Sequence, residues 1–238
     1  MIETRRQVQL VLAFLFIIAL LYFWPFFKKR MQTFQPIQYV RVEGAFQYIS
    51  KADIEAKIEP LVQVGYFGVN LQLIRQAVMQ LPWAETVQVE REWPNRIKLR
   101  IYEQKPVVRW QADGLLNRKG EIFKPLNLDK FQVLPVLYAP MVQRHQLLAV
   151  MQGLELTLTD QGWHLAEFNV SQRQSWLLRM ENGLTIQLGR WQPLQKFSQL
   201  MSALAVVGTD VVGKMAYIDM RYPNGFAVRW REGEVVTW

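Results

Sequence analysis

The chain opens with a long apolar segment. Residues 10–27 form eighteen consecutive positions without a charged side chain. As a helix that rises about 1.5 Å per residue, this run spans about 27 Å, close to the hydrocarbon core of a bilayer. The run ends in bulky aromatic side chains, and three basic residues follow, which is typical of a membrane interface. We therefore predict three segments: a tail over 1–7, an uncleaved transmembrane helix over 8–27 and a linker over 28–37.

Two other interpretations of this segment compete with a membrane span. A cleavable signal peptide has a shorter apolar run that ends in small residues, and this run ends in large ones. A buried helix of a soluble domain is the other alternative, although no side of this segment is polar. The flanking charges leave the orientation open, because Arg5 and Arg6 on one side face Lys28, Lys29 and Arg30 on the other.

Residues 38–105 carry the pattern of a small α+β unit. A strand is predicted over Tyr39–Phe46. Ser50, with Asp53 three residues later, resembles a capping box that opens a helix. Asn70 is suited to cap a second helix, which Pro82 ends. Each helix has one apolar stripe, formed by Ile54, Ile58, Leu61 and Val62 in the first and by Leu71, Ile74, Val78 and Leu81 in the second.

Two strands with period-two alternation complete this unit. Their apolar positions are Val87, Val89 and Trp93 in one strand and Ile97, Leu99 and Ile101 in the other. Polar residues stand between them, so one face of the sheet should be buried and the other wet. Residues 93–96 (Trp-Pro-Asn-Arg) are expected to form the turn. The unit is thus predicted to run β-α-α-β-β, with both helix stripes on the inner face of the sheet.

Residues 106–238 are richer in short strands and form a second predicted domain. Two Asn-Gly turns, at 182–183 and 224–225, indicate hairpins because both residue types accept positive φ. Helices are predicted from about Gln143 to Leu158 and from Pro193 to Gly208. The stripe of the second helix is Leu194, Phe197, Leu200, Met201 and Leu204. The fold class is therefore α+β: a single transmembrane helix, a β-α-α-β-β domain, and a mixed β-sheet domain with two helices.

Composition and charge exclude several functions. The net charge is +8, but five cations and one acid in residues 1–30 account for half of it. The remaining bases are dispersed among acids, without the basic stripe and interleaved aromatic residues that nucleic-acid binding requires. The absence of cysteine excludes disulfides, thiolate metal sites and cysteine nucleophiles.

No catalytic constellation is visible in the sequence. Phosphate-binding glycine loops, the zinc-protease H-E-x-x-H motif and the G-x-S-x-G nucleophile motif are all missing. A metal site shared by His145 and His164 is conceivable, but two surface or structural histidines are the better interpretation. Acidic and basic residues are interleaved in the two predicted strands within residues 84–103, which predicts cross-strand charge pairs. The acids are Glu85, Glu90, Glu92 and Glu103, and the bases are Arg91, Arg96, Lys98 and Arg100. We expect no enzyme activity, no cofactor and no metal.

The terminal hairpin is the best candidate for a binding surface. Its last strand ends the folded part of the sequence and is suited to a sheet edge, where unpaired N–H and C=O groups can accept a partner strand. Arg221, Tyr222 and Trp230 are of residue types that are enriched at binding hot spots. The alternative is that this strand is simply protected.

The ordered motifs of the chain resemble those of the FtsQ/DivIB family of bacterial cell division proteins, over nearly the full length. In the first domain and directly after it they are Val42-Glu43-Gly44, Leu81-Pro82-Trp83, Trp93-Pro94 and Glu103, Pro106, Trp110. In the second they include Leu134-Pro135-Val136-Leu137, Arg173-Gln174-Ser175-Trp176, Leu188-Gly189-Arg190 and residues 218–230. The resemblance implies that residues 38–105 form a POTRA domain and that residues 106–238 form the β domain of this family.

The resemblance also implies a function and a location. Such a protein is a single-pass inner-membrane component of the divisome, with a cytoplasmic N-terminus, a periplasmic bulk and enrichment at the septum. It is a scaffold that bridges early and late division proteins and binds FtsB and FtsL, while its POTRA domain meets other divisome proteins. By the same resemblance, the FtsB-binding residues are Arg173, Arg221, Tyr222 and Trp230.

Three other functions compete with this one. A POTRA-type envelope assembly or transport factor would need a β-barrel or a secretion partner, and only one POTRA-like unit is predicted. An envelope enzyme acting on cell-wall polymer would need a polar cleft with acids of perturbed pKa. A membrane-linked nucleic-acid binder disagrees with the dispersed charges of the body.

Overall fold

A computed structural model of the chain describes residues 15–19, 22–24 and 36–233. Residues 15–19 and 22–24 belong to the predicted span and are helical and exposed. Within the described ranges, no helix combines the length and apolar character needed to cross a membrane. The rest of the predicted span, the tail over 1–7 and residues 28–35 of the linker lie outside the described residues, so the transmembrane helix over 8–27 stays a prediction.

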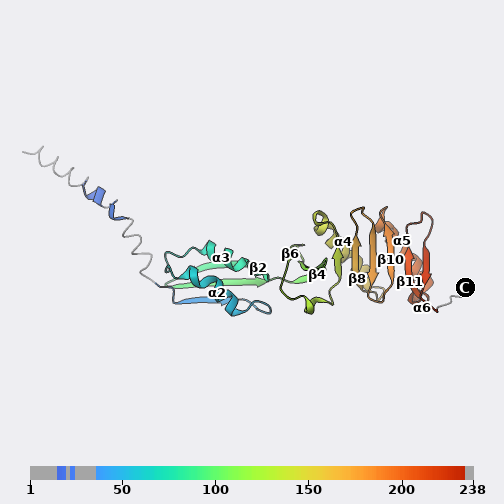
Figure 1. The fold of residues 1–238 in the computed structure, drawn as a ribbon, viewed down its shortest axis with the longest axis horizontal. Helices are drawn as coiled ribbons and strands as arrows, with labels where there is room; N and C mark the ends of the chain where they lie inside the picture. The colour runs from blue at the N-terminus through green and yellow to red at the C-terminus, as the bar shows by residue number, and fades with distance from the viewer. Residues whose placement is uncertain (1–14, 20–21, 25–35, 234–238) are drawn as a thin grey trace, which may run out of the picture. The chain divides into compact units, whose positions relative to one another are not determined.

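The chain divides into two compact units between Gln104 and Lys105. The first unit has the predicted element order (Figure 1): β1 (Tyr39–Glu43), α2 (Lys51–Val62), α3 (Leu71–Met79), β2 (Ala84–Glu92) and β3 (Arg96–Glu103). Its sheet has the order β1-β3-β2, with β1 parallel and β2 antiparallel to β3. The predicted first strand is thus shorter than expected and ends at Glu43, because Gly44 follows and the chain turns toward α2.

Both helices of the first unit begin at the predicted caps. The Oγ atom of Ser50 accepts a hydrogen bond from the Asp53 amide at 3.0 Å. The Oδ1 atom of Asn70 accepts from the amides of Gln72 and Leu73 at 2.9 and 3.3 Å. These bonds satisfy helix N–H groups that have no intrahelical acceptor. The two apolar stripes meet the inner face of the sheet in one core, which contains Ile54, Ile58, Ile74, Val78, Val87, Ile97, Leu99 and Ile101.

One expectation for this unit is wrong, and another is incomplete. Trp93 does not share the buried face of β2, because the strand ends at Glu92 and the indole lies in the following turn, 80% exposed. The register does place Glu90 opposite Lys98, as the predicted cross-strand charge pairing requires, but Lys98 and Arg100 also form ion pairs with Glu43 on β1, at 3.3 and 3.1 Å. The parallel β1–β3 register places Glu43 beside Arg100, an arrangement that local sequence cannot indicate.

The second unit is built on a sheet whose order among the described residues is β12-β11-β10-β9-β8-β7-β4-β5-β6. The strands are β4 (Pro106–Trp110), β5 (Gly114–Asn117), β6 (Ile122–Phe123), β7 (Val136–Tyr138), β8 (Leu165–Val170), β9 (Trp176–Met180), β10 (Thr185–Gly189), β11 (Met215–Asp219) and β12 (Ala227–Trp230). The predicted Asn-Gly turns at 182–183 and 224–225 connect β9 to β10 and β11 to β12, which pair in antiparallel as hairpins. The sheet is mixed, as predicted, because β10 pairs with β11 in parallel and with β9 in antiparallel.

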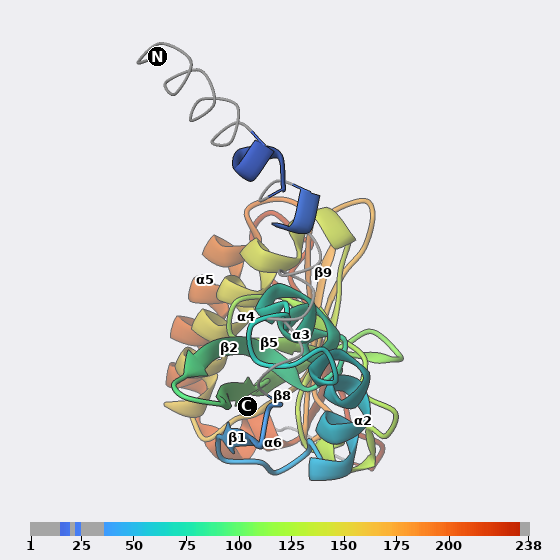
Figure 2. The same cartoon turned by 90° about the vertical axis from the view of Figure 1, so that its left-hand side faces the viewer.

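Two long helices, α4 (Arg144–Thr159) and α5 (Pro193–Val207), lie on one side of this sheet (Figure 2). Their buried side chains join those of the strands in one core, including Leu147, Met151, Leu158, Phe197, Leu200 and Leu204. Leu194 is not part of this stripe as predicted. It lies in the first turn of α5 and is 53% exposed. The sequence also gave no indication of the short helix α6 (Thr209–Gly213) or of the 3₁₀ turns η1 (Asp129–Phe131) and η2 (Met141–Gln143).

Strand direction gathers three chain segments at one end of the sheet. Because β8 and β10 are both antiparallel to β9, they run in the same direction, and β11 is parallel to β10. The carboxyl ends of β8, β10 and β11 therefore lie at the same end of the sheet. This end holds the 171–175 turn, residues 190–192 and residues 220–222.

Candidate functional site

The terminal strand β12 lies at an edge of the second sheet. It pairs with β11 on one side, in antiparallel register from Asp219 opposite Ala227 to Met215 opposite Trp230. On its other side no strand lies among the described residues. Its side chains alternate between exposed and half-buried, so it is only partly covered by the core. The expectation that the last strand occupies a sheet edge is confirmed for the described part of the chain.

The backbone of Val228 points to the free side of β12. The Met220 amide donates to the Gln187 carbonyl at 2.8 Å, so the Met220 N–H group faces β10, as do the backbone groups of Ile218 two residues earlier. Backbone direction alternates along a strand, so Asp219 and Tyr217 face β12 instead. Their partners Ala227 and Arg229 face β11 in return. Val228, between them, directs its N–H and C=O groups away from β11, where a partner strand can bind them.

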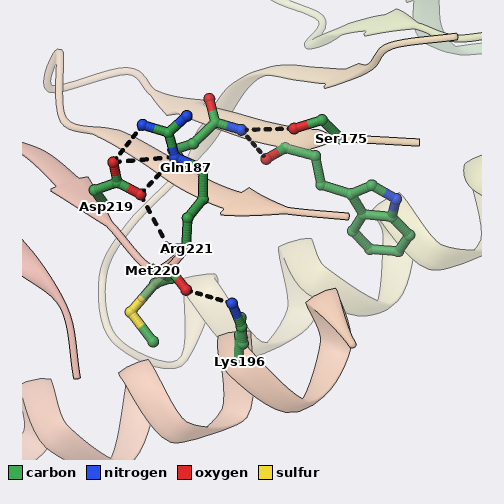
Figure 3. Close-up of polar contacts among 7 residues, drawn as sticks. Ser175, Gln187, Lys196, Asp219, Met220 and Arg221 are labelled. Atoms are coloured by element: carbon green, nitrogen blue, oxygen red, sulfur yellow. Dashed lines mark hydrogen bonds and ion pairs between the residues drawn. The ribbon is translucent and has the colours of Figure 1, made fainter. Parts of the chain in front are cut away.

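A buried carboxylate fixes Arg221 beside this edge. The Arg221 Nε atom donates to both Asp219 oxygens at 2.9 and 3.1 Å, and Nη2 donates to Oδ2 at 2.6 Å (Figure 3). The Asp219 side chain is 11% exposed, whereas that of Arg221 is 61% exposed. The guanidinium thus faces solvent while one of its edges is held. Its Nη1 group makes no bond to another described residue and can serve a partner.

Electrostatics keeps this pair charged over the physiological pH range. The hydrogen bonds from Arg221 hold the pKa of the Asp219 carboxyl below its usual range, against the opposing effect of burial. The same carboxylate raises the pKa of Arg221. On the neighbouring Tyr217, burial raises the pKa of the phenol, and the Asp219 charge adds to that effect. The site therefore presents a permanent cation to solvent, supported by a permanent anion beneath it.

Further contacts connect the Arg221 segment to the rest of the sheet end. The aliphatic part of Arg221 lies across Gly189, where a β-carbon would come within 3.0 Å of Arg221 Cγ. Lys196, on α5, donates from Nζ to the Met220 carbonyl at 2.6 Å. The Gln187 side chain donates to Ser175 Oγ at 3.1 Å and to the Trp176 carbonyl at 2.9 Å (Figure 3). Gln187 therefore connects the β8–β9 turn to the segment that carries Arg221.

Arg173 lies at the exposed tip of the β8–β9 turn. Two backbone hydrogen bonds close this turn. The Ser171 amide donates to the Ser175 carbonyl at 3.1 Å, and the Gln174 amide donates to the Ser171 carbonyl at 2.9 Å. Ser171 Oγ also accepts from the Ser175 amide at 3.1 Å. Within the described residues Arg173 makes no ion pair, in contrast to Arg221. The fold thus places the two predicted arginines at the same end of the sheet, one free and one held.

Tyr222 joins these arginines, whereas Trp230 does not. Tyr222 follows Arg221 directly, is 56% exposed and borders an open hollow formed by residues 222–227. Trp230 lies opposite Met215, at the amino-terminal end of β11 and hence at the other end of the hairpin. Its indole is half-buried against the core of the unit. Three of the four predicted residues therefore lie at the same end of the sheet, and Trp230 lies toward the other end, on the edge strand β12.

Several residues of this site were not predicted from the sequence. Asp219, Gln187 and Lys196 hold the site together, and Trp191 adds an indole that is 69% exposed at the carboxyl end of β10. The Arg190 guanidinium lies over the Trp191 ring, 5.1 Å from its centroid. One signal could have revealed Asp219: a single acid in an apolar strand, two residues before an arginine and so on the same face.

The histidines do not combine into a metal site. His145 Nδ1 lies 2.8 Å from the Lys119 carbonyl oxygen, and His164 Nδ1 lies 3.6 Å from a carboxylate oxygen of Glu155. They belong to different local contacts at the two ends of the α4 region. In the described part of the chain, no three histidine or acidic side chains gather as metal ligands.

Each of the two units matches a known protein family. Residues 35–104 match the family described as "POTRA domain, FtsQ-type", and residues 108–221 match "Cell division protein FtsQ/DivIB, C-terminal". The first match contains the whole β-α-α-β-β unit. The second ends at Arg221, so β12 lies beyond it.

Relatives along most of the chain carry the name "Cell division protein FtsQ". The protein of Methylomonas methanica is 38% identical over 210 residues, which cover 88% of this chain and 84% of the relative. That of Cellvibrio japonicus is 31% identical over 84% of this chain and 62% of the relative. That of Xanthomonas campestris is 31% identical over 82% of this chain and 70% of the relative.

Proposed function

The chain belongs to the FtsQ/DivIB family of bacterial cell division proteins, and we propose that it is a non-enzymatic scaffold that joins early and late proteins of the divisome. Family membership gives it a role in cell division together with protein partners. The proposal adds a topology: residues 8–27 span the inner membrane, the N-terminus is cytoplasmic, and both folded units are periplasmic and concentrate at the septum.

The proposed partners of the second unit are FtsB and FtsL. One observation carries this assignment: β12 is an edge strand with outward backbone groups at Val228, and the held cation Arg221 lies at one end of it. A partner segment of FtsB that adds as a strand to β12 would gain backbone hydrogen bonds along the edge. Acidic side chains of that segment would then meet Arg173 and Arg221, and Tyr222 would supply apolar contact.

The shifted pKa values of two carboxyl groups agree with a scaffold rather than an enzyme. The carboxyl groups of Glu43 and Asp219 have their pKa lowered, in both cases first by hydrogen bonds from an arginine. A general acid at neutral pH requires the opposite displacement. The alternative of a POTRA-type envelope assembly or transport factor is the weaker proposal, because residues 108–221 match the C-terminal domain of FtsQ/DivIB proteins.

Arg173 offers the sharper test of the binding site. Because it makes no ion pair within the described residues, Arg173→Glu should leave the fold intact. Arg118 is an exposed arginine in the β5–β6 turn, at the opposite end of the same sheet, and supplies the matched control Arg118→Glu. The periplasmic segment of FtsB is titrated calorimetrically into the full chain in detergent.

We expect Arg173→Glu to weaken FtsB binding about tenfold or more, because it replaces an attractive charge by a repulsive one. Arg118→Glu should bind like the wild type. Equal affinity of all three proteins would contradict the assignment of Arg173, and equal weakening by both variants would indicate a non-specific effect of net charge.

A further inference from the structure

Aromatic and cationic side chains lie exposed at one end of the first unit. Trp93 is 80% exposed and Tyr39 is 62% exposed. Arg96 lies opposite Tyr39 in the β1–β3 register, and its guanidinium carbon is 5.8 Å from the centroid of the tyrosine ring. We call Tyr39, Trp93, Asn95 and Arg96 the turn surface. Two large aromatic side chains exposed at the same end of the unit bury little surface in the fold, and their grouping suggests a use outside the unit.

The turn surface lies where the chain enters the first unit. The Gln38 amide donates to the Asn95 carbonyl at 3.1 Å, which ties the start of β1 to the β2–β3 turn. In the sequence, ten residues (28–37) separate the end of the predicted span from Gln38. At no more than about 3.6 Å per residue, those ten residues cannot exceed about 36 Å. A span at 8–27 therefore keeps the turn surface within that distance of a lipid headgroup layer.

The chemistry of this surface fits a membrane interface. Tryptophan and tyrosine are enriched at the headgroup level because their rings are both apolar and hydrogen-bonding. Basic side chains are attracted to anionic headgroups. On the open face of the sheet, the two cross-strand rows nearest the turn contain more bases than acids. The bases are Arg41, Arg96 and Lys98 and the acids are Glu90 and Glu92, which leaves a small positive excess.

We propose that the turn surface docks on the anionic headgroup layer of the membrane that holds the N-terminal segment. The proposal rests on the anchored topology proposed above. The tether keeps the turn at high local concentration near the lipid, so a contact that is weak in solution suffices. Docking would restrict the orientation of the first unit at the membrane and so limit the positions from which it can meet other proteins.

The absence of cysteine makes a direct test possible, because one introduced thiol is unique. The full chain with Asn95→Cys carries a fluorescent label at the turn and is reconstituted in phosphatidylglycerol-containing vesicles. Nitroxide groups on the lipid headgroups then quench a label that lies in the interface. Two variants remove the proposed contacts, Trp93→Ala and Arg96→Gln. Trp191→Ala is the matched control, because it deletes another strongly exposed indole, which belongs to the second unit.

Docking predicts strong quenching at position 95, loss of much of it in Trp93→Ala, and no change in Trp191→Ala. Arg96→Gln should weaken the local docking equilibrium about fivefold, and only in vesicles with anionic lipid. Quenching that is unaffected by Trp93→Ala would overturn the proposal, since the tether alone would explain it. Protection of the label that depends on an added division protein would also overturn it, in favour of a protein contact.

Failure of the anchor is distinguishable from failure of the docking. If the chain is released from vesicles by an alkaline wash, the proposed topology itself is wrong. If the chain stays with the vesicles and the label at position 95 is unquenched, the anchor stands and the docking is wrong.

Discussion

Arg221 combines a structural contact with a proposed binding contact. Its guanidinium donates hydrogen bonds to the Asp219 carboxylate through Nε and Nη2, while most of the Arg221 side chain stays exposed. Charge reversal at Arg221 would therefore place two carboxylates together and disturb the sheet end itself. A binding defect in such a variant would not separate recognition from folding, which is why Arg173 is the better probe of recognition.

Removing the Arg221 charge should make the stability of the fold less sensitive to a fall in pH. In the wild type the Asp219 pKa is lowered, so its ionised form stabilises the fold at neutral pH. That stabilisation is lost as the pH falls below about 4, through the lowered pKa. In Arg221→Met the carboxyl stays buried without its partner, so its pKa should rise.

We therefore expect Arg221→Met to melt several degrees below the wild type at pH 7, with a difference that shrinks between about pH 5 and pH 3. Melting temperatures measured by circular dichroism across this range check the prediction. Arg179→Met, on the same sheet, removes an exposed arginine 3.5 Å from Glu167 and serves as the control. A difference that is constant with pH would argue against the Asp219 pair as its source.

Gly189 is required by both its backbone angle and its neighbour. Its φ is +78°, and an added β-carbon would lie 3.0 Å from Arg221 Cγ. We expect Gly189→Ala to lower the free energy of unfolding by about 1–2 kcal/mol from the backbone strain. Gly153→Ala in α4, where a β-carbon meets nothing within 4 Å, should instead be neutral or stabilising. Urea denaturation of both variants measures the difference.

At the residue scale, sequence patterns identified exposed functional types better than their contacts. Arg173, which the family resemblance implies, and Arg221 and Tyr222 lie at one end of the sheet. The alternation of apolar residues predicts a buried Trp93, but β2 ends one residue earlier, at Glu92. The role of Asp219 is not evident from the sequence, because a buried acid in an apolar strand is explained only by its contact with an arginine.

At the level of elements, the helix caps and hairpin turns could be predicted because they depend on neighbouring residues. Ser50 and Asn70 bond to amides two or three positions away. The parallel pairing of β10 with β11 could not be predicted, since α5 and α6 separate the two strands in the sequence. That pairing places β12 at the edge and brings the Arg221 segment beside Gly189.

Glu103 should be a strong local determinant of the first unit. At the end of β3, its carboxylate accepts hydrogen bonds from the amides of Gln47, Tyr48 and Ile49, at 2.7–3.0 Å, in the loop before α2. Removing this acceptor leaves those N–H groups unsatisfied. We expect Glu103→Ala to cost about 1–3 kcal/mol of unfolding free energy. Glu59→Ala, on the exposed face of α2, should cost little, and chemical denaturation compares the two.

For the whole molecule, the net charge of +8 divides between two regions of the chain. Half of it lies in residues 1–30, around the predicted span, and the other half is dispersed over the two folded units. In the folded units, Arg100 is paired with Glu43 and Arg221 with Asp219. Such a distribution lacks the basic stripe that a polyanion-binding protein requires, and it agrees with the scaffold proposed above.

The central claim is that a partner strand adds to the free side of β12, and the Val228 amide tests it most directly. Val228→Pro removes an N–H group that points away from β11, so the β11–β12 pairing keeps its hydrogen bonds, and proline is tolerated at such edge positions. Val228→Ala is the matched control, because it loses similar packing and keeps the N–H group.

The measurement is the affinity of the periplasmic FtsB segment for each of the two variants, determined by calorimetry. Melting curves first check that the two variants have equal thermal stability. Strand addition predicts that Val228→Pro binds about tenfold more weakly than Val228→Ala, since one backbone hydrogen bond is lost and the proline ring obstructs the incoming strand. Equal affinity of the two variants would contradict strand addition at β12.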